Sequence, residues 1–319
     1  MSKTVLGLDI GGTKCAAVLA RETNDGIELI DKVKMPTDLT IAPEEMLARL
    51  ADAADAAFSD RYPVDAVGIS CGGPLDSRTG VILGPPNLPG WGHVEAVKLI
   101  QARYGVPAYL QNDANACAVA EWKFGAGKGT ENMLFLTFGT GLGAGLILNG
   151  RLYTGTNDNA GECGHIRLQP FGPVAYGKAG SFEGFCSGGG LAQLGWSMAL
   201  EQVQMGNIPA YWHAGITPEE VTAKSIAEAA EAGDTTAREV YRVCGQHLGM
   251  GLSVLMDILN PQRIVLGSIF ARSGHLLWDA AKESIEREAL PMNAACCEVV
   301  PAALGEQIGD YAAVATALL

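Results

Sequence analysis

Hydrophobic and polar residues alternate along this chain with two different periods, and these periods divide it into strands and helices. Residues 4–9, 16–20 and 27–33 are short apolar or alternating runs separated by turn residues, which predicts three consecutive strands. Pro43 opens a segment with apolar residues at helical spacing as far as Ala57, which predicts a helix. Further along, residues 64–70 and 107–111 predict strands, and residues 93–104 and 114–124 predict helices.

Strands that alternate with helices predict an α/β fold in which ligands bind near the carboxyl ends of the strands. The glycine-rich residues 125–129 precede a second set of strands, so we place a domain boundary near residues 121–129. The second half is richer in helix. Thr217 and Pro218 carry helix-start signals, and a long amphipathic pattern runs from Asp234 to Leu259. We therefore expect two α/β domains, residues 1–121 and 122–305.

Composition and charge narrow the range of partners. The chain has 319 residues, of which 48% are hydrophobic and 18% charged, as in ordinary globular proteins. The formal net charge of −13 argues against nucleic acid or anionic membrane as a partner, although free peptide N–H groups and a divalent cation still allow phosphate binding. No leader segment or run of 18 apolar residues is visible. Eight cysteines without a Cys-x-x-Cys pair favour reduced thiols and a cytoplasmic location.

Two glycine-rich turns carry the clearest chemical signal. Residues 6–14 form an apolar run that ends in Asp9 and continues into Gly11-Gly12-Thr13-Lys14, and residues 134–145 repeat the design around Gly139-Thr140-Gly141. Both patterns favour a strand, a turn and a second strand that together hold a polyphosphate. Neither fits the Walker or Rossmann spacing. Hydride transfer on a nicotinamide cofactor is therefore a weak alternative.

Taken together, the motifs resemble the ROK family of sugar kinases and repressors, within the actin-like ATPase (ribonuclease H-like) fold with a cleft between two domains. The resemblance runs over most of the chain and rests on both hairpins together with these segments: Gly72-Gly73-Pro74, Asn87-Leu88-Pro89-Gly90-Trp91, Asn112-Asp113-Ala114-Asn115, Gly161-Glu162-Cys163-Gly164-His165, Glu183 and residues 260–267. It implies that the last helix, residues 306–319, packs on the first domain. Since no DNA-binding segment precedes Asp9, we expect the kinase branch.

The resemblance also implies roles for the acidic residues. Asp113 is the candidate general base, because it lies where a strand ends and a helix begins; the alternative is that it only caps the helix. Asp9 is expected to orient Mg²⁺ through water, with an ordinary turn aspartate as the alternative.

The remaining site residues bind nucleotide or sugar. The expected ATP-binding residues are Asp9, Gly11, Gly12, Thr13, Lys14, Gly139, Thr140, Gly141 and Gly267. For Lys14 a solvated surface lysine is an equal alternative. The expected sugar-binding residues are Gly73, Asn87, Asn112, Asp113, Glu162, His165 and Glu183. Carboxylates, amides and imidazole suit sugar hydroxyls, which both donate and accept hydrogen bonds. Taken alone, His165 favours a structural role, but Glu162 three residues earlier and Glu183 downstream favour ligand binding.

Two departures from the family pattern bear on the site. Most members bind a structural zinc through a cysteine cluster and the histidine, but Val174, Tyr176 and Ser181 replace the cysteines here. We therefore predict no zinc; a rearranged site with Cys163, His165 and Cys186 is the weaker alternative. Packing of Phe171, Tyr176, Phe182 and Phe185 is expected to hold this loop instead. The second departure is Ser268-Ile269-Phe270, where the family usually has glycine near the adenosine.

The sequence thus predicts an ATP- and Mg²⁺-dependent hexose kinase, with glucose as the leading substrate and its 6-hydroxyl as the acceptor. Fructose, mannose, allose and N-acetylhexosamines are the alternative sugars. Two further alternatives are a non-catalytic sugar sensor of the same fold and an ATPase that acts on a non-sugar substrate. The resemblance favours a homodimer.

Overall fold

The computed structural model describes residues 2–24, 26–58 and 63–319, and the chain folds into two compact units. The first unit contains residues up to 131 together with 145–160 and 303–319, and the second contains residues 132–144 and 161–302. The expected boundary near residues 121–129 differs from this division, because the chain around residue 121 is bound to the C-terminal segment of the first unit, as described below.

A five-stranded sheet of order β3-β2-β1-β4-β7 forms the core of the first unit. Its strands are β1 (Thr4–Ile10), β2 (Lys14–Thr23), β3 (Gly26–Pro36), β4 (Ala66–Cys71) and β7 (Ala108–Asn112). β1, β4 and β7 are parallel, with Asp9 opposite Ser70 and Cys71 opposite Asn112. Because parallel strands end at the same edge, Asp9 and Asn112 come to one edge of this sheet.

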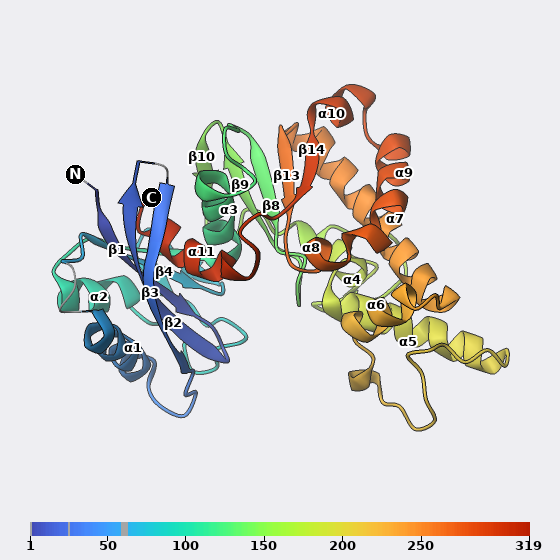
Figure 1. Cartoon of the computed structure of the whole chain (residues 1–319), viewed down its shortest axis with the longest axis horizontal. Helices are drawn as coiled ribbons and strands as arrows, with labels where there is room; N and C mark the ends of the chain where they lie inside the picture. Colours follow the sequence, from blue (N-terminus) through green and yellow to red (C-terminus); the bar gives the residue numbers. More distant parts are fainter. Residues whose placement is uncertain (1, 25, 59–62) are drawn as a thin grey trace. The chain divides into compact units, whose positions relative to one another are not determined.

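Alternation along β1 assigns its side chains to two faces of the sheet. Leu6, Leu8 and Ile10 belong to a large apolar cluster with α1 (Pro43–Phe58) and α2 (Ala96–Tyr104), whereas Val5 packs on the other face with α11 (Ile308–Thr316). Figure 1 shows α1 and α11 against this sheet, and α11 also contacts α3 (Asp113–Phe124). Asp9 is four residues after Val5, so its side chain lies on the same face of the sheet and faces α11.

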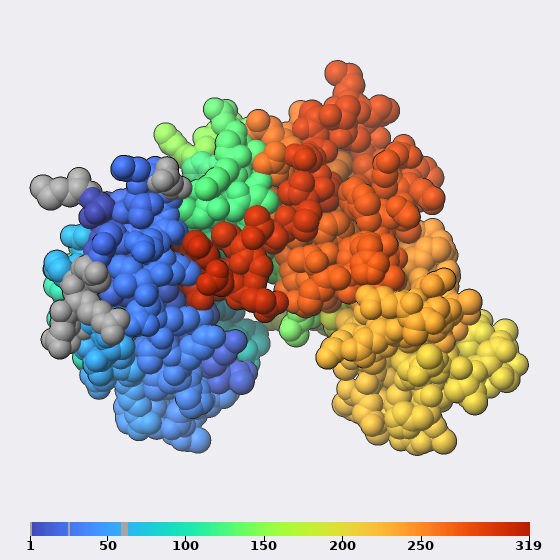
Figure 2. Space-filling view, viewed as in Figure 1, coloured from blue at the N-terminus to red at the C-terminus, as the bar shows by residue number. Residues whose placement is uncertain are grey.

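Two glycines in the sheet allow α11 to pack closely. A Cβ at Gly7 would lie 2.7 Å from the backbone nitrogen of Val314, and one at Gly68 only 2.2 Å from the carbonyl oxygen of Ala313. The space-filling view shows the result: C-terminal residues, in red, lie directly against the blue N-terminal part of the chain (Figure 2). Only residues without a side chain permit this contact.

A buried glutamate holds the chain that leads into α11. Glu121 of α3 accepts hydrogen bonds from the backbone amides of Ala126 at 2.7 Å, Leu304 at 2.9 Å and Ala303 at 3.2 Å. Its side chain is fully buried. Since a buried carboxylate needs such partners, this network explains why residues 303–319 return to the first unit.

The second five-stranded sheet has the order β10-β9-β8-β13-β14. Its strands are β8 (Met133–Leu136), β9 (Ala144–Leu148), β10 (Arg151–Tyr153), β13 (Arg263–Leu266) and β14 (Glu298–Pro301). β13 is parallel to β8 and to β14. Two small sheets are β5 (Leu75–Asp76) with β6 (Val81–Ile82), and β11 (Val174–Ala175) with β12 (Lys178–Ala179).

The remaining elements are mostly helices of the second unit. They are η1 (Cys163–His165), α4 (Phe182–Phe185), α5 (Gly188–Gln204), η2 (Pro218–Glu220), α6 (Ala223–Glu231), α7 (Thr235–Leu259), α8 (Ile269–Ser273), η3 (Gly274–Leu276), α9 (Trp278–Glu288), α10 (Pro291–Cys296) and, in the first unit, η4 (Gly305–Gln307). The long amphipathic pattern corresponds to α7, which Asp234 caps and Asn260 ends in a left-handed conformation. The start signals at Thr217 produce a single 3₁₀ turn. Among the described residues, no helix combines the length and apolar character that crossing a bilayer requires.

Candidate active site

The turn between β1 and β2 presents unpaired backbone amides. The Gly11 amide donates to the Lys14 carbonyl at 3.1 Å, while Thr37 binds the carbonyls of Gly11 and Thr13 through its hydroxyl at 2.6 Å and its amide at 3.1 Å. In the described part of the chain, the amides of Gly12 and Thr13 donate to no protein acceptor. Gly11 therefore shapes the turn, and Gly12 and Thr13 offer N–H groups to an anion.

Predicted sugar-binding residues lie beside this turn. A Cβ at Gly12 would lie 2.2 Å from the Asn87 carbonyl oxygen, so only glycine lets the two segments meet. The Asn87 amide also faces Gly72, where an added Cβ would lie 3.2 Å from Oδ1. An added Cβ at Gly73 would lie 3.9 Å from Asn112 Nδ2. The structure thus brings Asn87, Asn112 and the Gly72-Gly73 backbone together.

Asn112, and not Asp113, caps α3. Asn112 Oδ1 accepts from the Asn115 amide at 2.8 Å, which is an N-cap bond. Asp113 is the first helical residue, and its Oδ1 accepts from the adjacent Ala114 amide at 2.8 Å. Its side chain reaches solvent. Capping, the structural alternative for Asp113, is therefore carried out by its neighbour, which leaves the Asp113 carboxyl available for another role.

The pKa values of Asp9 and Asp113 are both raised, and desolvation is the first cause in each case. The pKa of Asp9 is raised from 3.8 to about 6, first by desolvation and then by the negative charges of Asp310 and Asp113, whereas Lys32 and Lys14 lower it. Desolvation also raises the pKa of Asp113, against the Ala114 hydrogen bond. This edge of the first sheet therefore concentrates negative charge that Lys32 and Lys14 offset only in part.

Asp310 and Lys32 belong to this cluster and were not singled out from the sequence. Lys32 of β3 forms an ion pair with the largely buried Asp310 of α11. Gly309, next to it, brings the start of α11 to the Asp9 carboxylate, since an added Cβ would lie 3.3 Å from Asp9 Oδ2. The one available signal was a lone aspartate in the small-residue sequence of α11.

The second glycine hairpin, between β8 and β9, is tied into the second unit. The Gly139 amide donates to the Gly141 carbonyl at 3.0 Å, and the Gly139 carbonyl accepts from the Gly188 amide at 2.7 Å. The amides of Thr140 and Gly141 donate to no acceptor among the described residues. This hairpin therefore repeats the first: one amide closes the turn and the next ones remain available to an anion.

Two glycines position the Glu162 and His165 pair on this hairpin. A Cβ at Gly161, which has a φ of +97°, would lie 1.9 Å from the Ala144 carbonyl oxygen, and one at Gly164 would lie 2.3 Å from that of Leu142. Glu162 and His165 themselves are exposed. The close backbone packing thus explains the glycine spacing and leaves both polar side chains at the surface of the second unit.

Glu183 and Gly267 are linked to the same hairpin. Glu183 Oε2 accepts from the Leu142 amide at 2.8 Å, so this predicted sugar ligand also braces the hairpin. The Gly267 amide donates to Leu136 at 2.9 Å, and the adjacent Ser268 has a φ of +47°. An added Cβ at Gly139 would lie 3.3 Å from Ser268 Oγ. The end of β13 therefore borders the phosphate turn.

The loop that replaces the family's zinc cluster is only partly packed as expected. Phe182 and Phe185 are buried, and Phe185 stacks on His247 with ring centroids 3.6 Å apart. Phe171 and Tyr176, by contrast, are 83% and 76% exposed, so they do not join this packing. Within the residues that the structure covers, no three His, Cys, Asp or Glu side chains are grouped so as to hold a metal.

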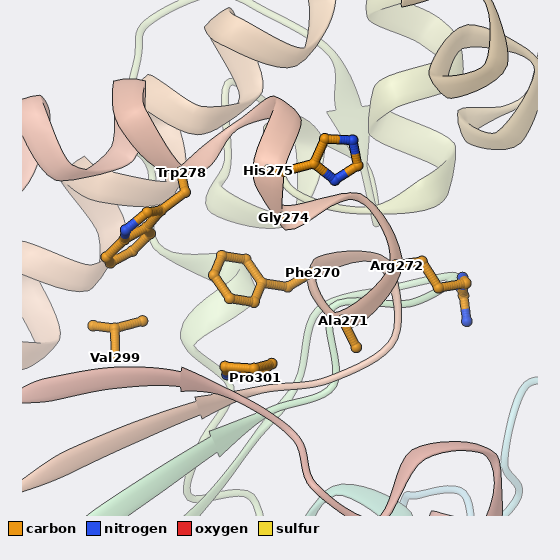
Figure 3. Close-up of a pocket in the computed structure, with 8 residues that line it drawn as sticks. All are labelled: Phe270, Ala271, Arg272, Gly274, His275, Trp278, Val299 and Pro301. Carbon is orange, nitrogen blue, oxygen red and sulfur yellow. The ribbon is translucent and has the colours of Figure 1, made fainter. Parts of the chain in front are cut away.

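A pocket opens beside the segment that follows Gly267. It has a volume of about 420 Å³ and is lined by Phe270, Ala271, Arg272, Gly274, His275, Trp278, Val299 and Pro301. Figure 3 shows the Phe270 ring between Trp278 and Pro301. The rings of Phe270 and Trp278 meet edge to face, with centroids 5.7 Å apart. Phe270, one of the bulky residues that depart from the family pattern, thus forms a pocket wall.

Comparison with known proteins defines the class to which this fold and site belong. The ROK family model matches residues 5–318, so the chain belongs to the ROK family. A glucokinase of Halalkalibacterium halodurans is 33% identical over 310 residues, which cover 95% of this chain and 92% of the relative.

Solved structures agree with this assignment. A ROK family glucokinase from Streptomyces griseus, crystallised with glucose and AMPPNP, shares 30% identity and a TM-score of 0.76 over 99% of both chains. The ROK hexokinase of Thermus thermophilus shares 31% identity and a TM-score of 0.81 over 100% of this chain and 98% of that one. The predicted two-domain α/β fold class is thereby confirmed.

Proposed function

We propose that this protein is an ATP-dependent hexose kinase that phosphorylates glucose at its 6-hydroxyl, with Asp113 as the general base. The observation that carries the proposal is the position of Asp113. Its carboxyl is free of the helix cap, reaches solvent, and lies on the sheet edge that also carries Asp9 and Asn112. The glucose and AMPPNP bound to the Streptomyces griseus relative support both substrates.

In this proposal Asp113 accepts the proton of the 6-hydroxyl as that oxygen attacks the γ-phosphorus of ATP, and the bond from the γ-phosphorus to the β,γ-bridging oxygen breaks to release ADP. The raised pKa of Asp113 makes it a stronger base than an ordinary aspartate, which suits proton abstraction near neutral pH. The free amides of Gly12 and Thr13, and those of Thr140 and Gly141, donate to phosphate oxygens on which charge develops. Catalysis thus relies on positioning and on preorganised dipoles.

The residues present fit the expected magnesium. Asp9 is a partly buried carboxylate whose pKa of about 6 is raised by desolvation and by the negative charges of Asp310 and Asp113, and a cation would relieve this cost. Mg²⁺ bound there through water would neutralise phosphate charge. Lys14, exposed beside Asp9, adds positive potential to the same turn.

Sugar recognition is assigned to two sets of polar groups, each described within its own unit. Asn87, Asn112, Asp113 and the Gly73 backbone form one set, and Glu162, His165 and Glu183 form the other. These groups accept and donate hydrogen bonds to hydroxyls, so a sugar that lacks one hydroxyl leaves a protein group unpaired. Selectivity among hexoses would follow from this penalty.

The pocket beside β13 is proposed to receive the nucleoside of the donor. It adjoins Ser268, which borders the second phosphate turn, and its walls include the rings of Phe270 and Trp278. Aromatic walls of this kind suit a purine base. Gly267 would then contact the nucleoside between pocket and phosphates.

A hexose panel tests the proposed function. ADP release is measured with a coupled assay on glucose, mannose, fructose, allose and N-acetylhexosamines, with and without Mg²⁺, and the phosphorylated position is assigned by ³¹P NMR. We expect the highest kcat/KM with glucose and a 6-phosphate product. Hexose binding without turnover would instead indicate a sugar sensor, and turnover on no hexose would contradict the proposal.

A cytoplasmic location is proposed from thiol chemistry, and a homodimeric state is proposed from family resemblance. All eight cysteines are free thiols, which fits a reducing cytoplasm. A homodimer is the expected state in solution, and light scattering after size exclusion measures it directly.

A further inference from the structure

The β11–β12 hairpin occupies the place of the family's cysteine cluster. Val174 pairs with Ala179 and Ala175 with Lys178, which leaves Tyr176 and Gly177 as a two-residue loop. Their φ angles are +49° and +74°, and positive values at both positions are typical of a type I′ turn. The hairpin therefore presents Tyr176 at its tip.

Tyr176 is an unfavourable residue for this turn. The left-handed conformation is adopted readily by Gly, Asn and Asp, whereas a bulky aromatic residue there is rare. Burial of the ring does not compensate, because the side chain is 76% exposed. Neither the residue preference of the turn nor burial in the core explains why a tyrosine occupies this position. Unfavourable backbone conformations of this kind concentrate at functional sites.

The hairpin is fixed to the predicted sugar ligand His165 at two points. Lys178 Nζ donates to the His165 carbonyl at 2.7 Å. The Tyr176 ring meets the His165 imidazole edge to face, with centroids 5.3 Å apart and an interplanar angle of 81°. One contact holds the backbone of His165 and the other orients its ring.

Further hydrogen bonds fix the hairpin to the rest of the second unit. Arg167 Nη1 donates to the Ala179 carbonyl at 2.6 Å. The Gln193 side chain of α5 binds both the amide and the carbonyl of Val174, at 2.9 and 2.8 Å. Tyr176 is therefore carried on a braced support and not on a loose loop tip.

We propose that Tyr176 is a positioning residue that holds the His165 imidazole in the orientation required to bind a sugar hydroxyl. In this chain the residues at the cysteine positions are Val174, Tyr176 and Ser181, so the ring contact takes over the task of orienting the histidine. The inference rests on the proposed sugar-binding role of His165. It makes Tyr176 a determinant of sugar affinity without a role in phosphoryl transfer.

The variant Tyr176→Asn separates this role from a structural one. Asn is a better residue for the turn, so we expect an equal or higher Tm. Loss of the ring contact should raise the KM for glucose roughly 2- to 12-fold and leave kcat and the KM for ATP unchanged. Tyr176→Phe should behave like the wild type. Phe171→Ala, which removes the more exposed ring of the same loop, is the matched control and should change neither constant.

A double-mutant cycle tests whether Tyr176 acts through His165. If it does, His165→Gln combined with Tyr176→Asn should have the same glucose KM as His165→Gln alone. Additive effects, or an unchanged KM with a lowered Tm in Tyr176→Asn, would overturn the inference.

Glucose binding measured by calorimetry without nucleotide gives the same comparison independently of turnover. A wild type that binds hexose without phosphorylating it would contradict the proposed function, and weaker binding by Tyr176→Asn would still support the inference. A wild type that neither binds nor phosphorylates any hexose would overturn both.

Discussion

At the residue scale, the proposed chemistry depends on carboxylates that the fold leaves without full compensation. Asp113 keeps its carboxyl free because Asn112 takes over the helix cap. Asp9 stays partly buried beside two other aspartates, and this raises its pKa to about 6. Such a cluster costs stability and is useful only when a cation or a polar substrate binds there.

The variant Asp9→Asn should stabilise the protein at high pH. The pKa of Asp9 is raised on folding from 3.8 to about 6, so its ionisation costs stability as pH rises from about 4 to about 6, and the full cost persists at higher pH. At pH 8 the gain should approach about 3 kcal/mol, and below pH 4 it should vanish. Denaturant unfolding at the two pH values measures this difference.

The control for this measurement is Asp76→Asn. Asp76 is half-buried, and the Thr79 amide holds its pKa below the ordinary value, so the substitution should not stabilise. If Asp9→Asn destabilised the protein at pH 8, the ionised Asp9 carboxylate would be stabilised by its neighbours in the free protein, against this account. The same variant should lose Mg²⁺-dependent activity.

At the element scale, short strands and their turns carry the site, and much of this was predictable. Apolar runs bounded by turn residues or by a helix start predicted β1, β2, β7 and β8 within a few residues, because buried strands have a strong hydrophobic pattern. The β11–β12 hairpin and α8 were not predicted, because each is too short to display a hydrophobic periodicity. Ion pairs between residues that are distant in sequence, such as Lys32 and Asp310, cannot be recognised from a local sequence pattern.

The packing of α11 on the first sheet gives a prediction for this element. A methyl group at Gly68 would meet the Ala313 carbonyl at 2.2 Å, so Gly68→Ala should destabilise the protein by roughly 1–3 kcal/mol. Gly92→Ala is the control, because an added Cβ there meets nothing within 4 Å. Equal melting temperatures for the two variants would show that α11 is not packed as described.

At the scale of the whole molecule, family membership and the return of the last helix to the first unit could be predicted, whereas the residue at which the two units divide could not. The boundary follows from hydrogen bonds such as those of Glu121 with residues 303 and 304, which are remote in sequence. The loss of the cysteine cluster was visible in the sequence, but the exposed position of Phe171 was not, because exposure depends on the folded loop.

The replaced cysteines predict how the whole protein responds to chelators. A structural zinc would contribute folding free energy, and its removal would lower the Tm. Here EDTA should leave the Tm unchanged and stop turnover, and excess Mg²⁺ alone should restore it. Metal analysis showing one zinc per chain, with a fall in Tm on chelation, would contradict the predicted absence of zinc.

The turnover of Asp113→Asn with glucose tests the central proposal most directly. Removing the general base should lower kcat about 10²- to 10⁴-fold, with little change in the KM for ATP, since the amide keeps the size of the side chain. The Asp76→Asn variant, measured alongside, should retain full activity. If Asp113→Asn keeps most of the wild-type kcat, Asp113 is not the base and the proposed mechanism is wrong.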